Sequence, residues 1–154
     1  MKIALGSDHA GFELKDHLGR ELASWGHDVV DLGTSSASES VDYPDFGAAV
    51  GRAVASGECD LGVAVCGSGI GISIAANKVA GVRAAVVHDV TSAHLAREHN
   101  HANVLCLGSR VTGVSVAEEA VAAWLSATPQ SGRHEGRIAK IAVLDQTENV
   151  TRGD

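Results

Sequence analysis

The sequence predicts a doubly wound α/β protein, in which helices cover both faces of a parallel sheet. Five short segments are almost continuously apolar, and a longer amphipathic segment follows each of them. Strands that are buried on both faces of a parallel sheet have this composition. The chain has 154 residues, which is about the length of one domain. We therefore expect a single domain over residues 1–154, a three-layer α/β/α sandwich with a Rossmann-like five-stranded parallel sheet.

The N-terminal part of the chain predicts two strands and two helices. Lys2–Gly6 is a short apolar run, and His27–Leu32 is a second one. Between them, Gly11–Trp25 has apolar residues at helical spacing, and these residues define one face of a helix: Leu14, Leu18, Leu22 and Trp25. A polar loop at Gly33–Ser40 follows, and Pro44 suits the first turn of a helix that runs to about residue 56.

The central part of the chain repeats the alternation twice. The segments are a strand at Leu61–Cys66, a helix at Gly69–Lys78, a strand at Val82–His88 and a helix at Thr91–Glu98. Each apolar run is of strand length, and each following segment is bounded by glycine or polar residues. Four of the five expected strands are then accounted for.

The C-terminal part predicts the fifth strand and two helices. Val104–Gly108 is the strand, and Ser115 with Glu118 forms a capping-box pattern that opens a helix to about residue 126. The inward face of this helix consists of Ala117, Ala120, Val121 and Trp124. A last helix is expected over Gly132–Gln146, with an apolar stripe of Ile138, Ile141 and Ala142. It lies beyond the five-strand unit, so we expect it to pack on a neighbouring subunit, with Thr147–Asp154 as a frayed tail.

Composition excludes several classes of function. The formal net charge is −7, which argues against nucleic-acid and anionic-membrane partners, and five aromatic residues are too few for a base-stacking surface. No apolar run approaches the roughly 18 residues of a membrane-spanning helix. Three cysteines occur without a CxxC pair (Cys59, Cys66 and Cys106), which predicts neither a disulfide framework nor a zinc site and fits a reducing cytoplasm.

Chemically competent residues gather at the carboxyl ends of the predicted strands, where ligands bind in such sheets. The segment Cys66–Gly71 (CGSGIG) is the most informative. Its glycines allow backbone N–H groups to approach a phosphate or a developing oxyanion. The segment resembles a dinucleotide fingerprint only partly, because it follows the third strand and no acidic residue is placed for a ribose. Cys66 itself precedes a helix N-terminus, where a thiolate is favoured; it is either a base or nucleophile, or a small buried apolar residue.

Three other charged groups admit two interpretations each. Asp8 and His9 end a buried strand, where they serve a ligand, or where Asp8 caps the first helix. His99 is a general acid, or a solvated histidine at a helix C-terminus; His99 and His101 lack a third metal ligand at suitable spacing, so no metal is expected. The remaining group, Arg133 and Arg137, shares one helical face and suits a phosphate, or is an ordinary solvated basic turn.

Taken together, the chain resembles the type B ribose-5-phosphate isomerase family, which includes galactose-6-phosphate and allose-6-phosphate isomerases. The matching stretches run in family order over nearly the whole chain: Gly6–Phe12, Asp42–Pro44, Cys66–Lys78, Arg97–Asn100, Asn103–Val104, Gly108–Arg110 and Gly132–His134. The block CGSGIGISIAANK is highly specific. The resemblance implies a cofactor-free aldose–ketose isomerase that interconverts ribose 5-phosphate and ribulose 5-phosphate through an enediol.

The resemblance also implies roles for individual residues. Cys66 would be the base that moves a proton between C2 and C1; one branch of the family uses instead a Glu where this chain has Ile72, so the chain resembles the Cys branch. Ser68 stands where many members have Thr and would help to shuttle the O1/O2 proton. His99 would open the furanose ring as a general acid. The substrate-binding residues would be Asp8, His9, Tyr43, Gly67, Gly69, Ile70, Gly71, Asn100, Arg110, Arg133, His134 and Arg137.

Within this set, the Gly67–Gly71 amides would hold the enediolate, Asp8 and Asn100 would bind sugar hydroxyls, and Tyr43 would line the sugar pocket. The phosphate would be surrounded by His9, Arg110, Arg133, His134 and Arg137. The family builds each site at a dimer interface, so the resemblance implies a homodimer, with a tetramer left open, and composite active sites. That agrees with the unplaced terminal helix.

Three alternatives remain from the sequence. The same chemistry could act on another phosphosugar, such as a tetrulose 4-phosphate, allose 6-phosphate or galactose 6-phosphate, with the Ser35–Val41 loop and the surroundings of Tyr43 setting the chain length. A non-catalytic phosphosugar-binding protein is the second alternative, although binding alone needs no base such as Cys66. A nucleotide-binding module is the third, and it would be stabilised by nucleotides.

Overall fold

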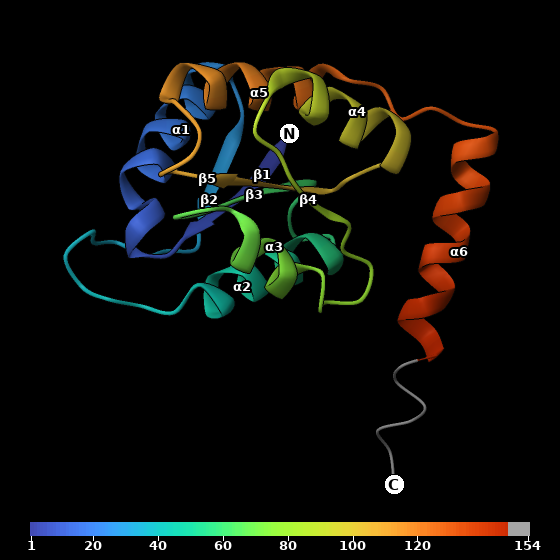
Figure 1. The fold of residues 1–154 in the computed structure, drawn as a ribbon, viewed down its shortest axis with the longest axis horizontal. Helices are drawn as coiled ribbons and strands as arrows, with labels where there is room; N and C mark the ends of the chain where they lie inside the picture. Colours follow the sequence, from blue (N-terminus) through green and yellow to red (C-terminus); the bar gives the residue numbers. More distant parts are fainter. Residues whose placement is uncertain (148–154) are drawn as a thin grey trace, which may run out of the picture.

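A computed structural model describes residues 1–147 of the chain. In this part, five strands form one sheet in the order β2-β1-β3-β5-β4, and every neighbouring pair is parallel (Figure 1). The strands are β1 (Lys2–Ser7), β2 (Asp28–Asp31), β3 (Leu61–Cys66), β4 (Ala84–Val86) and β5 (Val104–Gly108). The predicted five-stranded parallel sheet is confirmed, and its carboxyl ends meet at one edge.

Helices cover both faces of the sheet, so the predicted three-layer sandwich is also confirmed (Figure 1). The helices are α1 (Phe12–Ser24), α2 (Tyr43–Ala55), α3 (Ile70–Ala76), α4 (Val90–Asn100), α5 (Val114–Ser126) and α6 (Arg133–Thr147), and a 3-10 turn, η1 (His9–Gly11), precedes α1. One apolar core lies between the sheet and α1, α4 and α5, and a second lies between the sheet and α2 and α3.

Strand β4 is shorter than the predicted Val82–His88 because it is the edge strand and pairs with β5 alone. At the start of β4, side chains rather than a neighbouring strand accept hydrogen bonds from the backbone amides. The amide of Arg83 donates to Asn103 Oδ1 at 2.7 Å, and the amide of Ala84 donates to Asn77 Oδ1 at 2.8 Å. The central strands β3 and β5, in contrast, have the predicted bounds.

Two local predictions on helices are wrong. Trp25 lies beyond the last residue of α1 and is 38% exposed, whereas Leu14, Leu18 and Leu22 are buried as predicted. The capping box does not form, because the N-cap of α5 is Gly113, two residues before Ser115. Its Glu118 instead contacts His17 of α1.

Helix α6 extends beside the sandwich rather than covering the sheet (Figure 1). It reaches the body of the molecule at a few points, including a 2.9 Å hydrogen bond from the amide of Gly81 to Asp145 Oδ2. Much of its apolar surface stays exposed within one chain, including Ile141 at 42% and Leu144 at 63%. Of the predicted tail, Thr147 is helical, and residues 148–154 lie outside the described residues. Among residues 1–147, no helix is both long and apolar enough to span a membrane.

The two tryptophans offer a matched test of the core. Trp124 is fully buried, and its Nε1 donates to the carbonyl of Ala102 at 3.2 Å. We expect Trp124→Ala to lower the free energy of unfolding by about 3–5 kcal/mol, because it leaves a large cavity. The control Trp25→Ala should change it by less than about 0.5 kcal/mol, because that side chain is at the surface. Urea unfolding followed by circular dichroism measures both, and equal losses would contradict this packing.

Candidate active site

A cavity of about 340 Å³ opens at the carboxyl edge of the sheet, where β1, β3 and β5 end. Its lining residues are Asp8, His9, Ala10, Tyr43, Cys66, Gly67, Ser68, Gly71, Arg110 and Val111. Eight of these ten were predicted from the sequence as site residues. Ala10 and Val111 were not; they directly follow predicted residues and add apolar wall.

Cys66 is the last residue of β3, is 3% exposed and lines the cavity. The amide of Gly69 donates a hydrogen bond to Cys66 Sγ over 3.1 Å. Gly69 adopts a φ of +78°, and a Cβ there would lie 2.9 Å from the carbonyl carbon of Leu107, so the turn requires glycine. A backbone N–H donor is thus directed at the sulfur. The thiol is buried, as one interpretation predicted, and it lines the cavity, where the other interpretation predicted a base.

The rest of the Cys66–Gly71 turn is packed by two cavity side chains. The ring of Tyr43, the first residue of α2, lies so close to Gly71 that a Cβ there would come within 2.6 Å of it. A Cβ added at Gly67 would likewise lie 3.2 Å from a guanidinium nitrogen of Arg110. The amide of Ile70 donates to Ser68 Oγ at 3.2 Å. Two of the predicted anion-binding amides, those of Gly69 and Ile70, are thus engaged within the turn, and neither residue lines the cavity.

Asp8 and His9 enter the cavity from η1, the turn that follows β1. Asp8 is buried, and its Oδ1 accepts a hydrogen bond from the amide of Gly11 at 3.0 Å. Asp8 therefore caps the 3-10 turn η1, whereas the N-cap of α1 is Gly11, which makes no side-chain cap, so the predicted cap of the first helix forms one element earlier. The carboxylate nevertheless lines the cavity. His9 Nδ1 lies 3.2 Å from both the amide nitrogen and the carbonyl oxygen of Val41, which fixes the ring against the end of the 33–42 loop.

The other predicted site residues form a second group. His99 and Asn100 end α4, and Arg133, His134 and Arg137 lie in the first turns of α6. The rings of His99 and His134 stack with centroids 4.4 Å apart and an angle of 7° between them. Burial, and then the nearby charges of His99, Arg133 and Arg137, lower the pKa of His134. The lowered pKa favours the neutral form of His134 at pH 7, and the side chains of Arg133 and Arg137 beside it are exposed.

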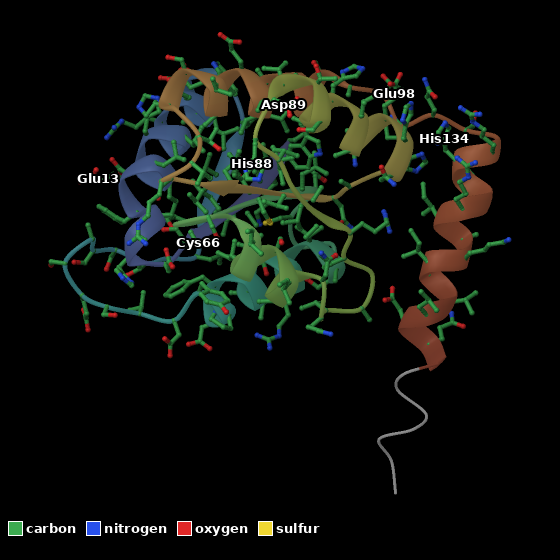
Figure 2. All side chains as sticks on the ribbon, in the orientation of Figure 1. Glu13, Cys66, His88, Asp89, Glu98 and His134 are labelled. Atoms are coloured by element: carbon green, nitrogen blue, oxygen red, sulfur yellow. The ribbon has the colours of Figure 1, made fainter. Side chains whose placement is uncertain are left out.

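The two groups lie at opposite ends of the strands: the cavity is at the carboxyl ends, and the second group is at the amino ends. The second group surrounds the end of α4, which precedes the amino end of β5, whereas Arg110 follows the carboxyl end of the same strand. Strand β5 has five residues, which span about 13 Å at the usual rise of a strand. Figure 2 shows Cys66 at the sheet and His134 at the top of α6, well apart. One chain therefore does not bring all the predicted site residues together.

His99 and His101 contact different partners. His99 stacks on His134, while His101 Nε2 lies 2.7 Å from the carbonyl oxygen of Gln130. Within residues 1–147, a possible set of metal ligands is found instead at His17, Glu21 and Glu118, whose donor atoms lie within 4.8 Å of one another. These three residues belong to α1 and α5, and none of them lines the cavity.

Fold and cavity together define an α/β protein with a thiol, a carboxylate, an imidazole and a guanidinium around a small pocket. The family model described as Ribose/Galactose Isomerase matches residues 3–141. Ribose-5-phosphate isomerase B of Escherichia coli strain K12 is 49% identical over 148 residues, which are 96% of this chain and 99% of that protein. The chain belongs to the ribose/galactose isomerase family.

Solved structures agree with this assignment. Ribose-5-phosphate isomerase B of Clostridium thermocellum superposes with a TM-score of 0.94 at 51% identity, over 96% of this chain and 99% of that one. The enzyme of Mycoplasma genitalium, solved with bound ribulose-5-phosphate, superposes with a TM-score of 0.91 at 42% identity, over 94% and 96% of the two chains. The family resemblance seen in the sequence is confirmed.

Proposed function

We propose that this protein is a cofactor-free aldose–ketose isomerase that interconverts ribose 5-phosphate and ribulose 5-phosphate through an enediol. The observation that carries the proposal is that Cys66 lines the cavity, with the amide of Gly69 directed at its sulfur. A related structure holds ribulose-5-phosphate. The proposal places this chain in the branch of the family with a cysteine base, because Ile72, fully buried and apolar, offers no carboxylate.

The reaction needs one base and no electron acceptor. The Cys66 thiolate removes the proton from C2 of the open-chain aldose, and the electron pair moves through the new C1–C2 double bond to O1. The resulting enediolate takes the proton back at C1, while the Ser68 hydroxyl carries a proton from O2 to O1. A base close to the reacting carbons and a cavity that limits water access suit this chemistry.

Substrate binding is shared among the other residues around the cavity. Asp8 accepts hydrogen bonds from sugar hydroxyls, and Tyr43 forms the wall beside the sugar chain. His9 and Arg110 bind phosphate. The phosphate group supplies binding energy away from the reacting carbons, which helps to hold the substrate in place for proton transfer.

A second copy of the chain supplies the rest of the site. We assign ring opening to His99, hydroxyl binding to Asn100, and further phosphate contacts to Arg133, His134 and Arg137, all from the partner in a homodimer. Two features support this assignment: the two groups lie at opposite edges of one chain, and α6 exposes apolar surface such as Leu144. Burial of that surface against the partner would stabilise the dimer. The three cysteines are free, which fits a cytoplasmic enzyme.

A coupled isomerisation assay tests this function. Ribose 5-phosphate is supplied beside four-carbon and six-carbon aldose phosphates, and formation of each ketose phosphate is followed. We expect the highest kcat/KM on ribose 5-phosphate. The family description includes galactose as well as ribose, so a higher kcat/KM on a six-carbon or four-carbon substrate would keep the chemistry and change the assigned sugar. Phosphosugar binding without turnover on any substrate would contradict the isomerase assignment.

A further inference from the structure

Ser109 links two parts of the cavity that are far apart in the sequence. It is the first residue after β5, and its Oγ donates a hydrogen bond to the carbonyl of Ala10 over 2.7 Å, across 99 positions of the chain. Ala10 belongs to η1, the turn that begins directly after Asp8 and includes His9. Sequence reasoning noted Ser109 only as a strand-end residue, because its partner is not visible from local pattern.

The backbone of the same segment is tied to the Cys66 turn. The amide of Ser109 donates to the carbonyl of Cys66 at 2.9 Å, and the amide of Arg110 donates to the carbonyl of Gly67 at 3.0 Å. Strands β1 and β5 both pair with β3 and not with each other. Ser109 therefore reaches across the end of β3, with its backbone on the Cys66 side and its hydroxyl on the Asp8 side.

The other hydrogen bonds of η1 and Asp8 to this end of the sheet are longer or local, although Gly11 also packs closely against the backbone of Val65. The amide of Asp8 reaches the carbonyl of Val65 over a long 3.3 Å, and the hydrogen bond from Gly11 to the Asp8 carboxylate lies within the turn itself. The 2.7 Å hydrogen bond donated by the Ser109 hydroxyl thus fixes η1 relative to the segment that carries Arg110. Loss of this bond leaves the backbone ties of Cys66 in place and loosens only the turn with Asp8 and His9.

We propose that Ser109 is a positioning residue, which holds Asp8 and His9 at the correct distance from Cys66 and Arg110 for substrate binding. This inference rests on the proposed function. According to the proposal, substrate affinity depends on the Ser109 hydroxyl. Proton transfer at Cys66 does not depend on it. The backbone amide of Ser109, which any residue except proline supplies, maintains the Cys66 side.

Kinetics of three serine variants test the proposal. Ser109→Ala should raise KM for ribose 5-phosphate about fivefold or more and leave kcat within about twofold, as expected for one lost hydrogen bond in the binding machinery. Ser109→Thr keeps the hydroxyl and should restore KM to within about twofold of wild type. Ser126→Ala is the matched control, because Ser126 Oγ donates to the carbonyl of Ala123 on an exposed helix end; KM should not change.

Two further readouts distinguish positioning from a general structural role. The rate of Cys66 alkylation by iodoacetamide should be equal in wild type and Ser109→Ala, and competitive inhibition by inorganic phosphate should weaken with KM. A lowered melting temperature with unchanged KM would overturn the proposal, as would a joint loss of kcat and Cys66 alkylation. An inactive wild-type enzyme would overturn the proposed function and this inference with it, whereas an active wild type with an unaffected Ser109→Ala variant would overturn the inference alone.

Discussion

Replacement of Cys66 by alanine is expected to lower kcat by about a thousandfold while KM for ribose 5-phosphate changes little. The reason is that the variant loses the only base proposed to move the proton between C2 and C1, and general base catalysis accounts for roughly that factor. The residues around the cavity that are proposed to bind phosphate and sugar hydroxyls remain. The coupled assay measures kcat, and titration calorimetry with the phosphosugar measures retained binding.

Cys106 provides the matched control for this experiment. It lies on the neighbouring strand β5, is completely buried and does not line the cavity, and burial raises the pKa of its thiol. Cys106→Ala should therefore keep kcat within a few-fold of wild type, with only a loss of stability. If Cys66→Ala kept substantial turnover, or if Cys106→Ala lost as much, Cys66 would not be the base.

Replacement of His99 by asparagine is expected to slow isomerisation much more than proton exchange on the open-chain ketose. Ribose 5-phosphate is mostly a closed furanose, whereas ribulose 5-phosphate is open-chain, because its O5 carries the phosphate and cannot close a five-membered ring. Loss of the proposed ring-opening acid should lower kcat/KM for isomerisation about a hundredfold, and by the same factor in both directions, because the equilibrium constant fixes their ratio. Exchange of the C1 protons of ribulose 5-phosphate with deuterated solvent should fall much less, because enediol formation from the ketose needs no ring opening.

The control for His99 lies on the same helix. His94 is exposed, contacts Glu98, and is not part of either group of site residues. His94→Asn should leave both isomerisation and C1 proton exchange unchanged. An equal loss of isomerisation and of C1 proton exchange for His99→Asn would show that His99 acts in binding or in proton transfer at the enediol rather than in ring opening.

Most of the fold could be predicted from the sequence, because the patterns that indicate strands and helices are local. Strands β3 and β5 are central and apolar throughout, and their predicted bounds hold. Strand β4 was predicted too long, because the side chains of Asn77 and Asn103 satisfy backbone groups that the pattern assigned to a ladder. The capping box at Ser115 failed because the start of α5 is set by Gly113.

The candidate site was predictable only to the extent that motifs identify it. The strand ends with Asp8, Cys66 and Arg110 do surround one cavity, as parallel topology requires. The group around His99 does not reach that cavity within one chain, and no pattern in the sequence reveals which edge of the sheet it occupies. The role of Ser109 depends on a hydrogen bond across 99 positions, which only the tertiary structure provides.

The central claim is an isomerase whose site needs Cys66 from one chain and His99 from another. It is tested most directly with a heterodimer of Cys66→Ala and His99→Asn subunits, each carrying a different affinity tag and purified through both. Each parent should be nearly inactive from ribose 5-phosphate. The heterodimer has one site with both native residues and one with neither, so it should recover about half of wild-type activity. A heterodimer as inactive as its parents would contradict the composite site.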